Sequence, residues 1–372
     1  MDSVDSWSPL RGFRLLTLRQ SEGLTQAELA SQLDVSQGFV SQVEKELKPF
    51  PDDLAVAAAE RFNVPVAYFR VARSRTEGGV ATYRRSSKAT AKDDGRVLAA
   101  FGDAARLFEA ASERSGYRAA DLDSVRDFDV EVTARNVRER LGLDPEEPVL
   151  NATRALERLG VGVVPELLEM GDLRPDHTGV SRPSHLVNRP IVATLGALPS
   201  AVARLTLMHE LGHLIYDRDR TTPIRGVRAA EERRAFAFAG AVLLPRTFIE
   251  RVVTESLALT GYLRIKAKFG VSVGAIVQRA HSVGVITPQR KRSLFIQLSS
   301  QGWRRDEPVD VAAEAPMLVR QATELGLARS SREVAELIGL RYGDAARWTG
   351  LPEEPPRPGG NVVQFQPRRA RG

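Results

Sequence analysis

Residues 204–216 read Arg-Leu-Thr-Leu-Met-His-Glu-Leu-Gly-His-Leu-Ile-Tyr, and they contain the pattern His-Glu-x-x-His from His209 to His213. On a helix, residues four apart share a face, so the two imidazoles can point at one metal ion. Glu210 lies beside them, where it can take a proton from an attacking water. The apolar residues around the motif favour a buried helix. The pattern is typical of metallopeptidases.

A second segment supplies a third ligand. Nineteen residues after His213 comes Glu232, at the acidic start of an apolar stretch that ends at Pro245. A tetrahedral catalytic zinc takes three protein ligands and leaves a fourth position open. Acidic residues are also common in the first turn of any helix because they suit the helix dipole, and this explains the neighbouring Glu231 better. We therefore predict Glu232 as the third ligand.

Together these residues resemble the ImmA/IrrE family of metallopeptidases over about residues 121–300. The resemblance is carried by Arg204, the HELGH core, Glu232, Ala235, Phe238, Ala239, Leu243-Leu-Pro245 and the short glycine-containing strand predicted at 178–181. It implies zinc bound by His209, His213 and Glu232, with Glu210 as the general base. It also implies a protein substrate, namely a repressor or another regulatory protein. The sequence departs from the family at Phe236, where Asn or Asp usually steadies a ligand.

Three further side chains are candidates for the same site. His177 and His185 precede the motif in predicted loops, and either could stabilise the oxyanion of a tetrahedral intermediate, although a surface histidine that makes no special contact is the simpler interpretation of each. Tyr216 lies one turn after His213 and could donate to a substrate carbonyl, although packing is the simpler interpretation. The chain has no cysteine, which leaves His and carboxylate as the ligand types. Such a site could also hold Mn²⁺ or Fe²⁺.

The N-terminal part of the sequence predicts a bundle of short helices. Thr25 and Glu28 form a capping-box pattern at the start of one helix, and Ser36 caps the next after a tight turn. Two short helices in that relation form a helix-turn-helix, whose second helix enters the major groove of DNA. The resemblance is to the Xre/Cro repressor family over about residues 10–69, through Gly23-Leu-Thr-Gln-Ala-Glu-Leu-Ala30, Val35-Ser-Gln, Val40-Ser and Glu44.

In that family the recognition helix reads bases from its first turns. This implies Gln37 and Gln42 as the base readers, since a glutamine amide can bond bidentately to adenine. Ser36 and Ser41 lie beside them as further DNA-binding candidates. Gln26, at the start of the preceding helix, would hold a backbone phosphate. Repressors of this kind read two half-sites, so we expect a homodimer on a double-stranded DNA operator.

The net charge of the N-terminal segment does not favour binding to DNA. Residues 1–75 hold nine basic and ten acidic side chains, a net charge of −1. Residues 73–96 hold seven basic and three acidic side chains, a net charge of +4. This basic arm either adds phosphate contacts or is a solvated linker.

Length and composition predict several domains. The chain has 372 residues, of which 42% are hydrophobic and 27% charged, enough for two or three domains. We expect an all-α helix-turn-helix domain at 1–75, a basic linker and connecting helix at 76–120, an α+β zincin-like metallopeptidase domain with a small sheet at 121–300, a small helical C-terminal region at 301–352 and a disordered basic tail at 353–372. Neither a membrane span nor a signal peptide is predicted, so we expect a cytoplasmic protein.

Two functions from different classes fit these patterns. The first is a DNA-binding transcription regulator whose zinc-dependent peptidase domain cleaves a repressor or regulatory protein, with its own helix-turn-helix region among the possible substrates. The second is a non-catalytic transcription factor whose peptidase-like domain senses a metal, ligand or partner protein and changes DNA affinity. The intact ligand set favours the first, whereas Phe236 and the fusion itself favour regulation.

Overall fold

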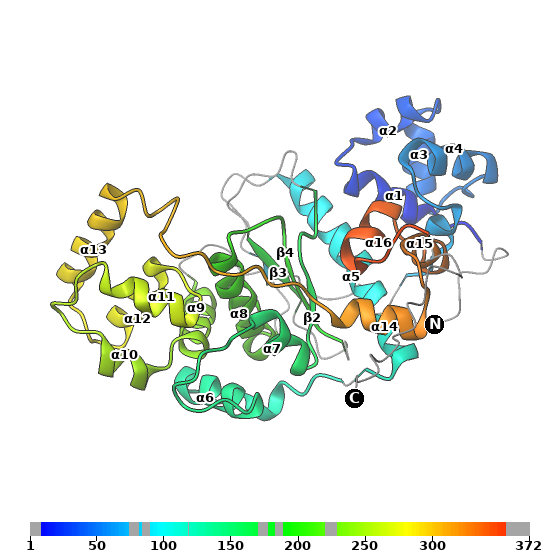
Figure 1. The fold of residues 1–372 in the computed structure, drawn as a ribbon. Coiled ribbons are helices and arrows are strands. Elements are labelled where there is room, and N and C mark those ends of the chain that lie inside the picture. The colour runs from blue at the N-terminus through cyan, green and yellow to red at the C-terminus, as the bar shows by residue number, and fades with distance from the viewer. Residues whose placement is uncertain are drawn as a thin grey trace, which may run out of the picture.

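A computed structural model describes residues 9–73, 82–83, 90–117, 119–169, 178–182, 189–219 and 229–354, with the backbone alone at 82–83. Helices predominate, and four short strands form one sheet near the centre (Figure 1). His177, His185 and residues 355–372 of the predicted tail lie outside the described residues. The predicted classes are confirmed: a helical N-terminal region, an α+β region with a small sheet and a helical C-terminal region.

The N-terminal domain is a bundle around its own apolar core, which includes Leu15, Leu29, Val40 and Tyr68. Its elements are α1 (Gly12–Ser21), α2 (Gln26–Gln32), α3 (Gln37–Glu44), α4 (Asp52–Phe62) and the 3₁₀-helix η1 (Val66–Arg70). The last element begins only at Val66, because a residue that precedes proline is disfavoured in the helical conformation and Val64 precedes Pro65.

The turn between α2 and α3 has the predicted capping. Thr25 Oγ1 accepts the N–H of Glu28 at 3.2 Å, and the Glu28 carboxylate accepts the N–H of Thr25 at 2.7 Å. Ser36 Oγ accepts the N–H of Phe39 at 3.2 Å and so starts α3. Asp34 has a left-handed φ of 52°, which closes the connection. These local interactions fix the angle between the two helices of the helix-turn-helix.

The middle of the chain forms a second core around two long helices that pack against each other, α8 (Ser200–Tyr216) and α9 (Ala230–Leu243). Around them lie η3 (Asp123–Val125), α6 (Val130–Arg140), α7 (Ala152–Arg158), α10 (Arg246–Val252), α11 (Gly261–Phe269), α12 (Val273–Ser282) and α13 (Pro288–Ser300). Met208, Leu211 and Phe238 are fully buried at the α8–α9 contact. The motif helix is therefore enclosed, as its apolar neighbours predict.

One small mixed sheet lies beside α8. It contains β1 (Thr82–Tyr83), β2 (Gly162–Val164), β3 (Gly179–Ser181) and β4 (Ile191–Thr194), in the order β1-β3-β4-β2. β2 runs parallel to β4, whereas β3 is antiparallel to both β4 and β1. Val163 and Val192 join the core with α8, and Val180 and Ala193 join a third core on the opposite face.

That third core combines segments from two distant parts of the chain. Its helices are α5 (Ala91–Ser115), α14 (Leu318–Gly326), α15 (Ser331–Ile338) and α16 (Tyr342–Thr349). Phe101, Leu107 and Trp348 are buried there. In Figure 1 these helices and α8 lie on opposite sides of the sheet. The predicted connecting helix and the predicted C-terminal region thus share one core with the sheet, because their apolar faces cover it.

The chain returns from α13 to α14 through an extended stretch that passes α8 and the sheet (Figure 1). Glu314 in this stretch pairs with the buried Arg204 of α8 and accepts the N–H of Thr153 at 2.8 Å. Glu157 on α7 accepts the N–H groups of Met317 and Leu318, at 2.9 and 2.8 Å. These carboxylates fasten the return segment at two helix N-termini, where negative charge is favourable.

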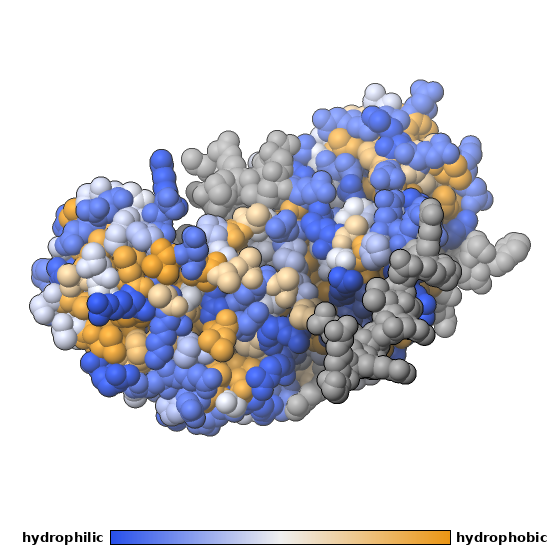
Figure 2. Space-filling view, in the orientation of Figure 1, coloured by the Kyte–Doolittle hydropathy of each residue, from blue (hydrophilic) through white to orange (hydrophobic). Residues whose placement is uncertain are grey.

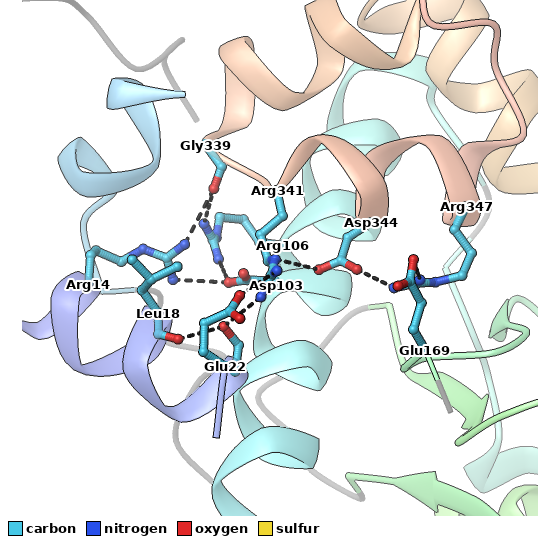
Figure 3. Close-up of polar contacts among 11 residues, drawn as sticks. Arg14, Leu18, Glu22, Asp103, Arg106, Glu169, Gly339, Arg341, Asp344 and Arg347 are labelled. Carbon is cyan, nitrogen blue, oxygen red and sulfur yellow. Dashed lines mark hydrogen bonds and ion pairs between the residues drawn. The ribbon is translucent and has the colours of Figure 1, made fainter. Parts of the chain in front are cut away.

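A buried charged junction joins the N-terminal domain to the rest of the molecule (Figure 3). Arg14 on α1 donates to Asp103 on α5 at 2.9 Å, to the Tyr68 carbonyl at 3.0 Å and to the Gly339 carbonyl after α15 at 3.3 Å. Arg106 also pairs with Asp103 and reaches the Gly339 carbonyl at 3.4 Å. Burial would raise the pKa of Asp103, but the two guanidiniums outweigh it and lower that pKa. The carboxylate is therefore charged and shared by both arginines.

The surface in Figure 2 mixes hydrophilic and hydrophobic residues at both ends of the molecule. Among the described residues, no helix combines the length and the apolar character that crossing a membrane requires.

Candidate metal centre and DNA-binding helices

Two helices bring the three predicted ligands together. His209 and His213 come from α8 and Glu232 from the first turn of α9, and all are buried. The two Nε2 atoms lie 3.1 Å apart. Glu232 Oε1 lies 3.3 Å from Nε2 of His213, and its Oε2 lies 3.4 Å from Nε2 of His209. The three ligand atoms all lie within 4.8 Å of one another.

The donor set fits a divalent metal. Two imidazole nitrogens and one carboxylate are the ligands of a common class of catalytic zinc site. His213 Nδ1 lies 2.7 Å from Asp217 Oδ2, so with Nδ1–H donating to this carboxylate the neutral ring presents the lone pair of Nε2 to the cluster. Glu232 Oε2 is buried without a hydrogen bond among the described residues. A buried oxygen without a partner is costly, and a cation between these atoms would satisfy it.

Mutual attraction between the ligands controls their ionisation. Burial would lower the pKa of His213, but hydrogen bonds to Asp217 and Glu232 outweigh it and raise that pKa to about 10. At neutral pH the ring is therefore protonated, and a metal ion must displace the Nε2 proton to bind there. Burial would raise the pKa of Glu232, but the interactions of its carboxylate with the two neighbouring histidines outweigh burial and lower that pKa to about 2. The carboxylate is therefore charged at neutral pH, as a metal ligand must be.

Glu210 lies on the side of α8 that faces the sheet. Its Oε2 accepts a hydrogen bond from Ser181 Oγ of β3 at 2.7 Å. A Cβ atom at Gly179 would lie 2.7 Å from Glu210 Oε1, so only glycine leaves room for the carboxylate there. Burial raises the pKa of Glu210. A raised pKa makes a carboxylate a better proton acceptor near neutral pH.

Asp217 is a functional candidate that the sequence analysis missed. It lies one turn beyond His213 at the end of α8, and its Oδ1 accepts a hydrogen bond from Arg234 of α9 at 2.6 Å. A carboxylate that holds the second nitrogen of a histidine ligand fixes the ring orientation and its tautomer. The signal was present in the sequence as a His-x-x-x-Asp spacing, because residues four apart share a helix face.

Phe236 stands where the resembling family has a polar residue. Its ring centroid lies 4.1 Å from that of His209, and the side chain is 41% exposed. It also lines a cavity of about 410 Å³, together with Leu205, Leu243, Val271 and Ala275 from α8, α9, α12 and the turn before α12. The cavity walls are mainly apolar. Phe236 thus places an apolar wall next to the metal ligands.

Tyr216 does not join this cluster. Tyr216 donates its hydroxyl to Thr133 Oγ1 on α6 at 2.8 Å, and its ring lies below the guanidinium of Arg234. This agrees with the packing interpretation. His177 and His185 lie outside the described residues.

The predicted DNA-reading residues lie on the helix-turn-helix and are partly linked to one another. Gln37 donates to Gln26 Oε1 at 2.9 Å, and Gln26 donates to Glu44 Oε2 at 2.7 Å. Glu44 is held in turn by Arg19 at 2.5 Å. This chain of hydrogen bonds positions both glutamine side chains at the N-terminal ends of α2 and α3, where they can face a phosphate or base edge.

The other candidates on α3 differ in exposure. Gln42 is exposed and Ser41 partly exposed, so both are accessible to a groove. Ser36 is also exposed, but its hydroxyl is engaged as the N-cap of α3.

Comparisons with known proteins support both halves of this description. Residues 156–281 match the peptidase family M78, described as the IrrE N-terminal-like domain, and residues 15–69 match a helix-turn-helix family. Over 58 residues the chain is 41% identical to the HTH-type transcriptional regulator PrpR of Mycobacterium tuberculosis, a stretch that covers 16% of this chain and 12% of that protein. No solved structure matches the chain significantly. The chain thus combines an Xre-type helix-turn-helix domain with an IrrE-like peptidase-family domain.

Proposed function

We propose that this chain is a DNA-binding transcription regulator that carries an active zinc metallopeptidase and cleaves a repressor or another regulatory protein. The observation that carries the proposal is the buried cluster of His209, His213 and Glu232 with Glu210 beside it. Three ligands leave one position open for water or substrate, which separates a catalytic zinc site from a structural one.

The chain's own residues account for the proton transfers of peptide hydrolysis. Bound at the cluster, a divalent metal supplies Lewis acidity, which makes water more acidic and polarises a peptide carbonyl. Glu210 takes the proton of the attacking water and passes it to the leaving nitrogen. Ser181 keeps Glu210 oriented through its hydrogen bond, and Asp217 keeps the His213 ring in register with the other ligands. The apolar cavity next to Phe236 suits a hydrophobic side chain of the substrate.

The helix-turn-helix supplies the second half of the proposal. Gln37 and Gln42 would read base edges, and Gln26 would hold a phosphate, with two copies of the chain on an operator of two half-sites. The exposed amide of Gln42 and the linked amides of Gln26 and Gln37 support this assignment. DNA binding would place the peptidase near repressors bound at the same promoters.

A peptide library tests the enzymatic half. The zinc-loaded chain and its Glu210→Gln variant are each incubated with a mixture of proteome-derived peptides, and new termini are identified by mass spectrometry. We expect discrete cuts, with an apolar residue next to the cleaved bond, that the variant does not make. Zinc-loaded protein that binds a selected operator but cuts nothing would leave the non-catalytic sensor as the function of this domain.

A further inference from the structure

β1 covers the edge of the strand that contacts the candidate general base. In the sheet order β1-β3-β4-β2, β4 takes one side of β3 and β1 takes the other. The register pairs Thr82 with Ser181 and Tyr83 with Val180, in antiparallel orientation. Without β1, therefore, β3 would be a sheet edge with free backbone N–H and C=O groups. Such an edge can bind an extended peptide as an added strand.

β3 also contacts the candidate general base, Glu210. Ser181, which pairs with Thr82, donates to Glu210 at 2.7 Å. Gly179 lies against the same carboxylate. Neighbouring strands lie about 4.8 Å apart, so a strand paired with β3 runs directly beside the residues that hold Glu210. The backbone of residues 82–83 thus occupies the place where a peptide bound at this edge would lie.

β1 is tethered to the rest of the chain at both of its ends. β1 follows the helix-turn-helix domain and precedes α5, so it belongs to the connection between the DNA-binding domain and the remainder. A segment tethered at both ends reaches its site at an effective concentration of about millimolar or higher. A peptide from another molecule has to displace it.

We propose that the segment around Thr82 and Tyr83 is an intramolecular substrate of the candidate peptidase, an inference that rests on the proposed function. Water adds across one peptide bond of this segment. The carbonyl carbon gains the hydroxyl and becomes a carboxylic acid, while the nitrogen leaves as an amine that receives the proton through Glu210. The products are a helix-turn-helix fragment and a fragment that begins near β1 and contains the metal cluster. Cleavage would separate covalently the two halves of the regulator.

The test follows the full chain by intact mass. Wild-type chain prepared in chelator is loaded with ZnCl₂ at several protein concentrations, beside Glu210→Gln. We expect two fragments whose masses place the cut within one residue of the Thr82–Tyr83 bond, at a first-order rate that does not depend on protein concentration. The Glu210→Gln chain should stay intact. The variant Thr82→Pro with Tyr83→Pro should lose the cut, because proline cannot donate to a strand ladder. The matched control, Ser86→Pro with Ser87→Pro, should keep it.

A second measurement is independent of activity. Hydrogen exchange of the β3 amides is compared in metal-free Glu210→Gln chain with and without the prolines at 82 and 83, and we expect faster exchange of β3 in the proline variant. Equal exchange would overturn the pairing on which the inference depends.

The outcomes separate this inference from the proposed function. If library peptides are cut while the chain stays intact, or if the chain is cut at another place, the inference that β1 is the substrate is wrong. The proposed peptidase function would still hold in both cases. If neither the library nor the chain is hydrolysed, the proposed function fails and this inference fails with it.

Discussion

Gly179→Ala tests the contact between β3 and Glu210 without altering any candidate ligand. The new Cβ atom would lie 2.7 Å from Glu210 Oε1 and 2.6 Å from Thr206 Cγ2. Ordinary contact begins near 3.4 Å, so the carboxylate must shift by about 0.7 Å. Misplacement of a catalytic group by about 1 Å can cost about 10²-fold in rate. We therefore expect kcat/KM for a library peptide to fall about hundredfold.

Stability and metal binding provide the controls. Overpacking of this kind costs about 1–3 kcal/mol of unfolding free energy. Adding Thr206→Ser removes Cγ2 and should restore part of that stability, but the clash with Glu210 remains and the activity should stay low. Zinc affinity, measured by chelator competition, should be unchanged because Glu210 is not a ligand. Full activity of Gly179→Ala at wild-type stability would refute this account of Glu210.

Three further changes probe other parts of the structure. Asp217→Asn weakens the hold on His213 and should lower zinc affinity about 10- to 100-fold in chelator competition; an unchanged affinity would show that Asp217 does not support the ligand. Arg14→Met removes one of the two guanidiniums that share the buried Asp103 carboxylate and should lower urea stability by about 3 kcal/mol, and the loss in the double variant with Asp103→Leu should be smaller than the sum of the two single losses; additive losses would contradict coupling. Gln37→Ala should cost about 1–3 kcal/mol on a selected operator and relax the preference at one base pair, whereas a uniform loss on all sequences would indicate a phosphate contact instead.

The parts of the site that the sequence could predict depend on short spacings. His209 and His213 share a helix face at a separation of four residues, and their Nε2 atoms lie 3.1 Å apart. The capping of α2 by Thr25 and of α3 by Ser36 was equally local. The prediction of Glu232 as a ligand depends on a contact between two helices. The apolar character of both segments indicates that contact.

The remaining features depend on contacts between distant segments. Arg14, Asp103 and Gly339 meet at one junction although they are far apart in the sequence, and no local pattern encodes that meeting. The two-residue strand β1 is too short for an alternating pattern to be visible, so the sequence of the basic arm does not indicate a strand. Asp217 lies four residues after His213, but that spacing alone does not specify a contact with His213 Nδ1.

The metal content of four purified proteins tests the central claim most directly. Native mass spectrometry counts zinc in the wild type and in the His213→Ala, Glu232→Ala and Glu210→Gln variants, with folding checked by circular dichroism. The account predicts one zinc ion per chain in the wild type and in Glu210→Gln, and loss of that zinc in the two ligand variants. Folded wild-type chain that holds no zinc would contradict it. Zinc that is retained in both the His213→Ala and the Glu232→Ala variants would contradict it as well.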